Sequence, residues 1–265
     1  MTMNTADERF LSDAARYAAY LETPEGRLRL DLAFANLREF LPQPTPLMRA
    51  LDLGCGTGKL GLRLARLGFH VILLDISRRM LDIAGRAAQD AEVADKIAMQ
   101  GGDATGITGL FEAESFDVIL CHNVLEFVDD PRAVLRSAAR LLRSSSGLLS
   151  VLVRNQLGEV LKAALVKGDL AAAEQSLGAD WGDESLYGGK VRLFTAKNLR
   201  AMLEDASFTV IAERGVRVVS DYLPAKISRT SEYERMFHLE RKLGSQAEFA
   251  AIARYTHCVA RVQVR

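Results

Sequence analysis

The sequence predicts an α/β protein with a doubly wound, mainly parallel sheet. Short apolar runs alternate with segments of helical periodicity along most of the chain, a pattern typical of repeated βα units. A glycine-rich turn, LDLGCGTGKLG at residues 51–61, directly follows the first apolar run, where such folds bind ligands. With 265 residues, of which 49% are apolar, the chain is long enough to form one large core.

Composition narrows the class of protein. Lys and Arg equal Asp and Glu at 34 each, so no overall charge favours nucleic acid or a membrane surface. No apolar run reaches the roughly 18 residues that cross a bilayer, and MTMNTADERF has no leader pattern, so we expect a cytoplasmic protein. Three cysteines, far apart and without ligand spacing, predict reduced thiols and no metal site.

The first 46 residues predict a helical cap that precedes the sheet domain of residues 47–265. Residues 25–41 carry apolar side chains at helical spacing, and Pro42 ends this helix. Two further prolines, Pro44 and Pro46, predict an extended connector to the first strand.

Five strands and three helices are expected to follow in alternation. The strands are predicted at residues 48–53, 70–75, 96–100, 116–122 and 147–153, and the helices at 59–67, 78–90 and 131–143. The third helix has a clear start, because Asp130 can cap it and Pro131 loses no hydrogen bond at the first helical position.

The rhythm of strands and helices breaks after the fifth strand. Residues 155–190 hold an alanine-rich helical piece and the acidic loop ADWGDESLYGGK, which predict an insertion, or lid, over the carboxyl edge of the sheet. The prediction ends with the following elements: a helix after Thr195, strands near 208–220 and 255–264, and a polar helix near 230–243.

The spacing of the glycines in LDLGCGTGKLG distinguishes three kinds of ligand. A triphosphate loop needs GxxxxGK[ST], and Leu53 and Leu60 stand where its first glycine and its hydroxyl are required. A dinucleotide fingerprint needs GxGxxG, and Lys59 occupies its third glycine position. The GxGxG spacing that remains lets a ligand approach the backbone closely.

The second strand ends in an acid, Asp75. It lies 21 residues after Gly54, where an acid commonly hydrogen-bonds ribose hydroxyls in doubly wound folds. Its alternative role is to cap the next helix, although Ser77 is better placed for that. The sequence therefore favours a ligand that contains a ribose.

Four motifs together resemble the class I S-adenosylmethionine-dependent methyltransferases. They are DLGCGTGKLG, DIS, GGDA and FDVILCHNVLEFVDDP, in the order and spacing of that family over residues 48–155. The resemblance implies a seven-stranded sheet with an antiparallel last strand, and S-adenosylmethionine as the cofactor across the carboxyl ends of the first strands. One departure is LRSSSGLL in place of the LxPGG turn of the family.

Motifs outside this core resemble the bacterial tRNA wobble-uridine carboxymethoxy methyltransferases, which esterify 5-carboxymethoxyuridine. These motifs are YLETPEGRLRLDLAFANL, HNVLEFV, RGVRVVSDYLP and ARYTHCVAR. The two resemblances imply tRNA as a partner and a set of cofactor-binding residues. In that set Arg29 would bind the methionine carboxylate. The other members are Asp52, Gly54, Gly56, Gly58, Asp75, Ile76, Asp103, Ala104, His122 and Asn123.

A carboxylate acceptor would need a cationic partner, and a bidentate arginine is the favoured one. Arg217 and Arg154 are the candidates, and Tyr222 and Tyr255 are candidates for contact with the base. The alternative for Arg217 is an ion pair with Asp221 or a solvated position. His122 also has two interpretations, a general base for a hydroxyl acceptor or a wall of the pocket.

Three functions stay open at this point. The first is methyl transfer to the carboxymethoxyuridine carboxylate of tRNA, and the second is methyl transfer to the carboxylate or hydroxyl of a small molecule. The acidic loop and the zero net charge favour the second. The third is an NAD-binding oxidoreductase or a non-catalytic nucleotide-binding protein, which the missing third glycine disfavours.

Overall fold

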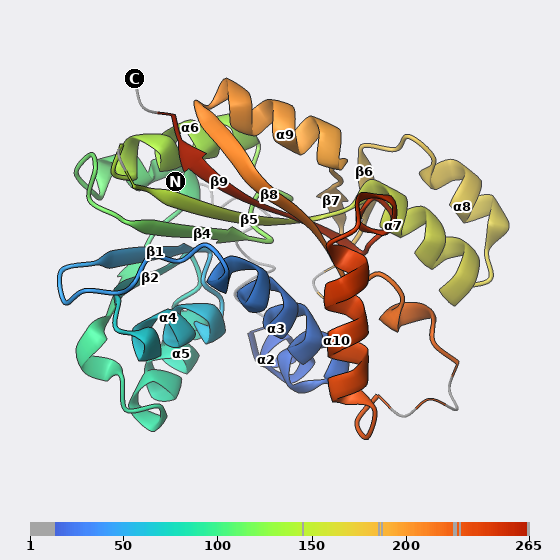
Figure 1. Ribbon diagram of the computed structural model, residues 1–265, viewed down its shortest axis with the longest axis horizontal. Helices are drawn as coiled ribbons and strands as arrows, with labels where there is room; N and C mark the ends of the chain where they lie inside the picture. Colours follow the sequence, from blue (N-terminus) through green and yellow to red (C-terminus); the bar gives the residue numbers. More distant parts are fainter. Residues whose placement is uncertain are drawn as a thin grey trace.

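The computed structural model describes residues 14–144, 146–184, 186, 188–224, 227 and 229–263. The first part of the predicted N-terminal cap and the last residue of the strand predicted at 255–264 lie outside these ranges. In the described chain, seven strands form one sheet in the order β3-β2-β1-β4-β5-β9-β8 (Figure 1). Its strands are β1 (Arg49–Leu53), β2 (His70–Asp75), β3 (Ile97–Gly101), β4 (Val118–His122), β5 (Leu148–Arg154), β8 (Phe208–Val216) and β9 (Tyr255–Val262).

The direction of the strands agrees with the predicted fold class. The five strands β1 to β5 pair in parallel, whereas β9 runs antiparallel to both of its neighbours, β5 and β8. The seven-stranded, mostly parallel sheet with an antiparallel last strand is thus confirmed. The strand order reverses between β1 and β4, and such a reversal opens a crevice at the carboxyl ends of the strands.

Helices cover both faces of the sheet (Figure 1). They are α2 (Ala14–Glu22), α3 (Pro24–Arg38), α4 (Lys59–Leu67), α5 (Arg78–Asp90), α6 (Pro131–Leu141), α9 (Ala196–Asp205), α10 (Tyr233–Gly244) and α11 (Ala247–Ala250). One buried cluster joins α3, α4 and α5 to the sheet, and a second joins α6 and α9 to the opposite face. A third cluster packs α10 against α3 near the ends of β5 and β8.

Local signals explain where the helices begin and end. Helices α4 and α5 have the predicted bounds, and Ser77 caps α5 by accepting a hydrogen bond from the backbone of Met80. The helix predicted at 25–41 ends earlier, at Arg38. The strand predicted at 208–220 ends at Val216, because Arg217 has a left-handed backbone with φ of 62° that cannot continue a strand.

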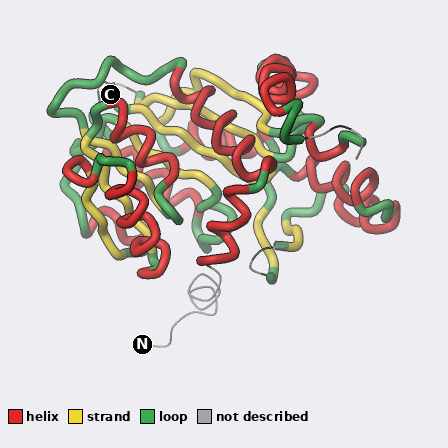
Figure 2. The backbone as a smooth tube through the Cα atoms, turned by 90° about the horizontal axis from the view of Figure 1, so that it is seen from below, coloured by secondary structure: helices red, strands yellow, loops and turns green. Residues whose placement is uncertain are grey.

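The segment 156–192, here called the insertion segment, leaves the sheet after β5. Its elements are α7 (Gln156–Leu161), a π-helical turn (Lys162–Val166), α8 (Leu170–Ser176) and a hairpin of β6 (Trp181–Asp183) and β7 (Lys190–Arg192). Figures 1 and 2 both place α7 and α8 at one end of the longest axis of the molecule. The insertion segment therefore adds a wall beyond the sheet itself.

Candidate active site

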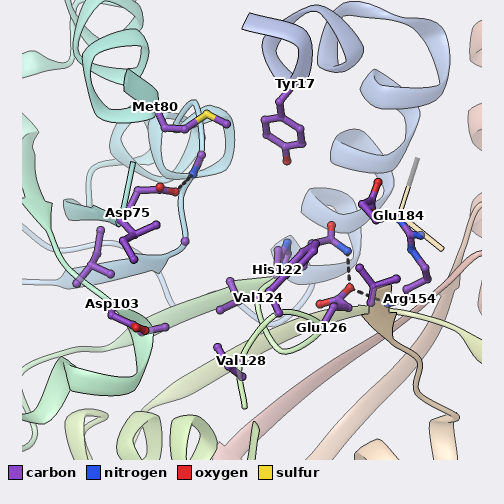
Figure 3. A pocket seen from close by; sticks show the side chains of 18 of the residues that line it. Tyr17, Asp75, Met80, Asp103, His122, Val124, Glu126, Val128, Arg154 and Glu184 are labelled. Atoms are coloured by element: carbon purple, nitrogen blue, oxygen red, sulfur yellow. Dashed lines mark hydrogen bonds and ion pairs between the residues drawn. The ribbon is translucent and has the colours of Figure 1, made fainter. Parts of the chain in front are cut away.

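A cavity of about 250 Å³ opens at the carboxyl ends of β1, β2 and β4, where the strand order reverses. Figure 3 shows that its labelled side chains spread from Asp75 and Asp103 at one end to Arg154 and Glu184 at the other. We call these the glycine end and the insertion end. The first is built from turns that follow strands, and the second includes the insertion segment.

The glycine turn after β1 forms the floor of the glycine end. Gly54 and Gly56 line the cavity, with φ of 59° and 54°, which are left-handed values that favour glycine. A Cβ on Gly54 would lie 2.6 Å from Cγ2 of Val124, so no side chain fits there. Gly58 lies instead at the N-cap of α4, outside the residues that line this cavity.

Asp52 occupies a buried position below the turn. Gly58 has no side chain to cap α4, and Asp52 Oδ2 accepts a hydrogen bond of 3.1 Å from the N–H of Gly61 instead. Asp52 lines a smaller adjoining cavity, which shares Gly54 and Arg29 with the main one. Burial raises the pKa of Asp52 to about 7.

Asp75 both shapes the turn and lines the cavity. One carboxylate oxygen accepts a hydrogen bond from the N–H of Gly56 and the other from the N–H of Ser77, each of 2.8 Å. Asp75 thus contacts the start of α5, but Ser77 is the cap of that helix, and the ribose role of Asp75 stays a prediction. Burial raises the pKa of Asp75, although the two backbone hydrogen bonds oppose the shift.

The rest of the glycine end follows β2 and β3. Asp103 caps a short 3-10 helix by accepting a 2.8 Å hydrogen bond from the N–H of Thr105. Ile76, Met80 and Ala104 add apolar surface to the cavity beside Asp103. Asp103 beside this apolar surface suits a planar nucleobase that has polar groups along one edge.

Arg29, from α3, forms the wall between the two ends. Its guanidinium donates hydrogen bonds of 3.0 Å to Asn123 Oδ1 and to the hydroxyl of Tyr17. It also lies over the rings of Tyr20 and Tyr255. Arg29 is 5% exposed and forms no ion pair with any described residue. A buried cation without a counter-charge makes this part of the cavity a site for an anion.

His122 and Asn123 lie between the two ends, as the last residue of β4 and the first after it. Asn123 adopts a left-handed backbone, with φ of 55°, and its side chain donates a 2.9 Å hydrogen bond to Glu126. His122 Nε2 lies 2.7 Å from Ser150 Oγ, and its Nδ1 is buried without a partner among the described residues. Burial lowers the pKa of His122 well below its usual value, so the ring is neutral.

The insertion end carries a buried network of charges. Arg154, the last residue of β5, forms ion pairs with Glu184 at 2.6 Å and Glu159 at 3.7 Å. Glu126 is 3% exposed, and its Oε1 accepts hydrogen bonds of 2.9 Å from the Arg154 backbone and from Asn123. The other oxygen, Oε2, has no partner in the described chain.

The structure does not bring Arg217 or Tyr222 into the wall of the cavity. Arg217 pairs with Asp221 and donates a 3.0 Å hydrogen bond to the hydroxyl of Tyr20, and Asp221 also pairs with Arg254. This ion pair is the alternative that the sequence left open for Arg217. The role of Arg217 as the partner of a bound carboxylate stays a prediction.

The sequence analysis missed several residues of this wall. They are Tyr17, Met80, Glu126 and Glu184, whereas Tyr255, a candidate for contact with the base, does line the cavity. Only Glu126 carried a signal, because an acid interrupts the apolar run of HNVLEFV. The tyrosines reach the site from α2 and β9, elements far from the glycine turn in the sequence.

These features define an α/β fold whose cavity has two acids at one end and a buried cation, without an ion pair among the described residues, in its wall. S-adenosylmethionine fits this cavity, since Asp75 and Asp103 would accept hydrogen bonds from its nucleoside part and Arg29 would pair with its carboxylate. A family model described as a methyltransferase domain matches residues 25–213 of this chain. The chain belongs to this methyltransferase family and is an S-adenosylmethionine-dependent enzyme.

Curated relatives and solved structures agree with this family. The chain is 31% identical over 246 residues to tRNA 5-carboxymethoxyuridine methyltransferase of Escherichia coli K12, covering 90% of both chains. It is 37% identical over 131 residues to ubiquinone biosynthesis O-methyltransferase of Hahella chejuensis, covering 48% of this chain and 50% of that one. A methyltransferase structure from Thermotoga maritima has the same fold, with a TM-score of 0.64 at 17% identity over 97% of this chain and 99% of that one.

Two features of the described residues bear on partners. In the part of the chain that the structure describes, no group of three or more His, Cys, Asp or Glu side chains is placed to hold a metal ion. No helix within those ranges combines the length and the apolar character that crossing a membrane requires.

Proposed function

We propose that this enzyme transfers the methyl group of S-adenosylmethionine to the carboxylate of 5-carboxymethoxyuridine at the wobble position of tRNA. The observation that carries this proposal is the 31% identity to the Escherichia coli enzyme of that activity, which extends over 90% of both chains. The match therefore spans more of the chain than the methyltransferase-domain model, which covers residues 25–213.

The cofactor residues take their roles from the geometry of the glycine end. Asp75 would accept hydrogen bonds from the ribose hydroxyls, and Asp103 with Ala104 would contact the adenine edge. Gly54 and Gly56 would give the methionine part its close approach to the backbone, and Arg29 would bind its carboxylate. When bound, the cofactor supplies an electrophilic methyl group on a sulfonium.

The acceptor requires alignment more than proton removal. A carboxylate is an oxygen nucleophile at neutral pH, so its transfer reaction needs no general base. Holding the reacting atoms in line can supply roughly 7–11 kcal/mol of barrier reduction. Arg154 is the arginine of the insertion end, and we propose that it orients the acceptor carboxylate in exchange for part of its contact with Glu184.

The test is an incubation with methyl-labelled S-adenosylmethionine and bulk tRNA, followed by mild alkali. A methyl ester releases its label as methanol, whereas a methylated base or ribose keeps it. We expect alkali-labile label on tRNA, and an unesterified carboxymethoxyuridine in tRNA from a strain that lacks the enzyme. Label that resists alkali, or an unchanged nucleoside profile, would exclude this acceptor.

A small-molecule acceptor is the second candidate, and the charges of the insertion end favour it. Glu126 and Glu184 lie in the cavity wall beside Arg154, and a wall with two acids disfavours a polyanion. The similarity to a ubiquinone biosynthesis O-methyltransferase, which covers 48% of this chain, also supports a small-molecule acceptor. Salt separates the two candidates, because tRNA binding weakens steeply with ionic strength and the binding of a small acceptor does not.

A further inference from the structure

A chain of buried polar side chains crosses the sheet behind His122. His122 Nε2 lies 2.7 Å from Ser150 Oγ, which lies 2.8 Å from Nε2 of His257. The other ring nitrogen of His257, Nδ1, lies 3.4 Å from the amide nitrogen of Asn36 on α3. These four residues, here called the histidine relay, come from β4, β5, β9 and α3.

The register of the sheet places the histidine relay on one face. His122 pairs with Leu152 on β5, and Leu152 pairs with His257 on β9, so these side chains share a side. Ser150 lies two residues before Leu152 and points the same way. The two rings meet edge to face, with centroids 5.3 Å apart. Ser150 and His257 are fully buried, so no bulk water completes their hydrogen bonds.

The donors and acceptors of the relay fit together in one direction. The amide nitrogen of Asn36 only donates, so Nδ1 of His257 must accept and its proton must lie on Nε2. His257 Nε2–H then donates to Ser150 Oγ, and the Ser150 hydroxyl donates to Nε2 of His122. If His122 instead carried its proton on Nε2, the buried Ser150 hydroxyl would lose its acceptor, which is costly.

Both rings are neutral, which this direction requires. Burial lowers the pKa of His257 to about 3 and that of His122 well below its usual value. With Nε2 of His122 accepting, its single proton lies on Nδ1, the buried nitrogen without a described partner. His122 and Arg29 both line the cavity, and this N–H is the one ring N–H of the relay that has no partner among the described residues.

We propose that Asn36, His257 and Ser150 are positioning residues that fix His122 as the Nδ1–H tautomer, so that it donates a hydrogen bond to a carboxylate oxygen in the cavity. A histidine held in this way cannot act as a general base through Nδ1. The enzyme would then favour acceptors that are nucleophilic without losing a proton, which rests on the proposed function. The tautomer itself does not depend on that function.

The first experiment locates the protons by ¹⁵N NMR of the histidine rings in the protein without ligand. We expect His122 protonated on Nδ1 and His257 on Nε2, with the exposed His70 and His238 as references. Single substitutions of the references to Gln assign the signals. A proton on Nε2 of His122 would overturn the proposal, and no variant of the relay is needed for this result.

The second experiment removes one link. Ser150→Ala should release His122 into a mixture of both tautomers, whereas Thr256→Val should leave its spectrum unchanged. Thr256 is a matched control, because its buried hydroxyl lies in the same sheet and has no partner among the described residues. Nδ1–H as the single tautomer of His122 in Ser150→Ala would contradict a positioning role for the relay.

The third experiment identifies the carboxylate. His122→Phe keeps a planar ring and removes the donor, and we expect about a tenfold loss at one of two steps. A weaker affinity for S-adenosylhomocysteine assigns the N–H to the methionine carboxylate. An unchanged affinity with a higher KM for unesterified tRNA assigns it to the acceptor. If both values stay within twofold, His122 does not donate to a carboxylate.

Discussion

The two ends of the cavity are built by different means. At the glycine end, backbone N–H groups and short turns hold the acids, as with Asp75, whose partners Gly56 and Ser77 lie within 19 residues of it. At the insertion end, side chains from distant segments hold one another, as with Arg154 and Glu184, which are 30 residues apart. The first end is therefore rigid and local, whereas the second depends on how the insertion segment packs.

The largest expected effect tests the glycine end. Asp75→Ala removes the proposed acceptor of the ribose hydroxyls and also frees the N–H groups of Gly56 and Ser77. We expect S-adenosylhomocysteine affinity to fall by at least about 100-fold, which corresponds to about 3 kcal/mol for two charged hydrogen bonds. Titration calorimetry measures the change.

A matched control for Asp75→Ala is Asp82→Ala. Asp82 lies in α5, the helix that follows Asp75, and forms an exposed pair with Arg78, so its loss should leave the affinity within twofold. Equal effects of the two substitutions would show that overall charge, and not the position of Asp75, determines binding.

The next effect separates the two ends. Arg154→Gln should raise the KM for the acceptor about 30-fold, the equivalent of about 2 kcal/mol for a charge-assisted hydrogen bond, with S-adenosylhomocysteine affinity unchanged. Because the substitution leaves Glu184 buried without its partner, the chain also becomes less stable. Steady-state kinetics with tRNA measure the KM for the acceptor, and calorimetry with S-adenosylhomocysteine measures the affinity for the cofactor product.

The double variant Arg154→Gln with Glu184→Gln removes both charges and restores stability. If it recovers the acceptor KM as well, Arg154 acts through folding and does not contact the acceptor. The exposed pair of Arg132 and Asp205, whose residues do not line the cavity, supplies the control, since Arg132→Gln removes the same charge.

The sequence predicts the glycine end well because its signals are local. GxGxG, the acid after β2 and the acid before Ala104 each act on a neighbouring turn, so their spacing alone carries the geometry. Arg217 shows the limit of such reasoning. Its partner Asp221 is four residues away, but neither its left-handed backbone nor its hydrogen bond to Tyr20 follows from that spacing. Spacing does not report which charges compensate one another.

The burial of His257 makes the stability of the protein depend on pH. Burial lowers the pKa of His257 to about 3, against about 6.5 in the unfolded chain, so only the unfolded chain takes up this proton between these values. Stability from this residue is complete above pH 6.5 and is lost as the pH falls toward 3. Relative to His257→Gln, the free energy of unfolding should fall by about 1.4 kcal/mol per pH unit in this window.

Urea unfolding of both proteins at several pH values measures this slope. The comparison with His257→Gln is needed because Asp52 acts in the opposite direction. Its pKa is raised to about 7, so its folded state binds a proton first, and its contribution grows on acidification from pH 7 toward 4. Parallel pH profiles for the two proteins would mean that His257 titrates normally.

The smallest expected effect concerns Glu126, which joins the two ends. Glu126→Gln keeps the oxygen that accepts from Asn123 and from the Arg154 backbone, and it replaces Oε2, which has no described partner. Burial raises the pKa of Glu126, so the substitution replaces a carboxyl that is costly to ionise. We expect the free energy of unfolding to change by less than about 1 kcal/mol.

Glu126→Ala removes the acceptor of both N–H groups and should cost about 1–3 kcal/mol for each group that stays unpaired. Equal losses in the two variants would mean that the charge of Glu126, and not its accepting oxygen, connects the glycine end to the insertion end.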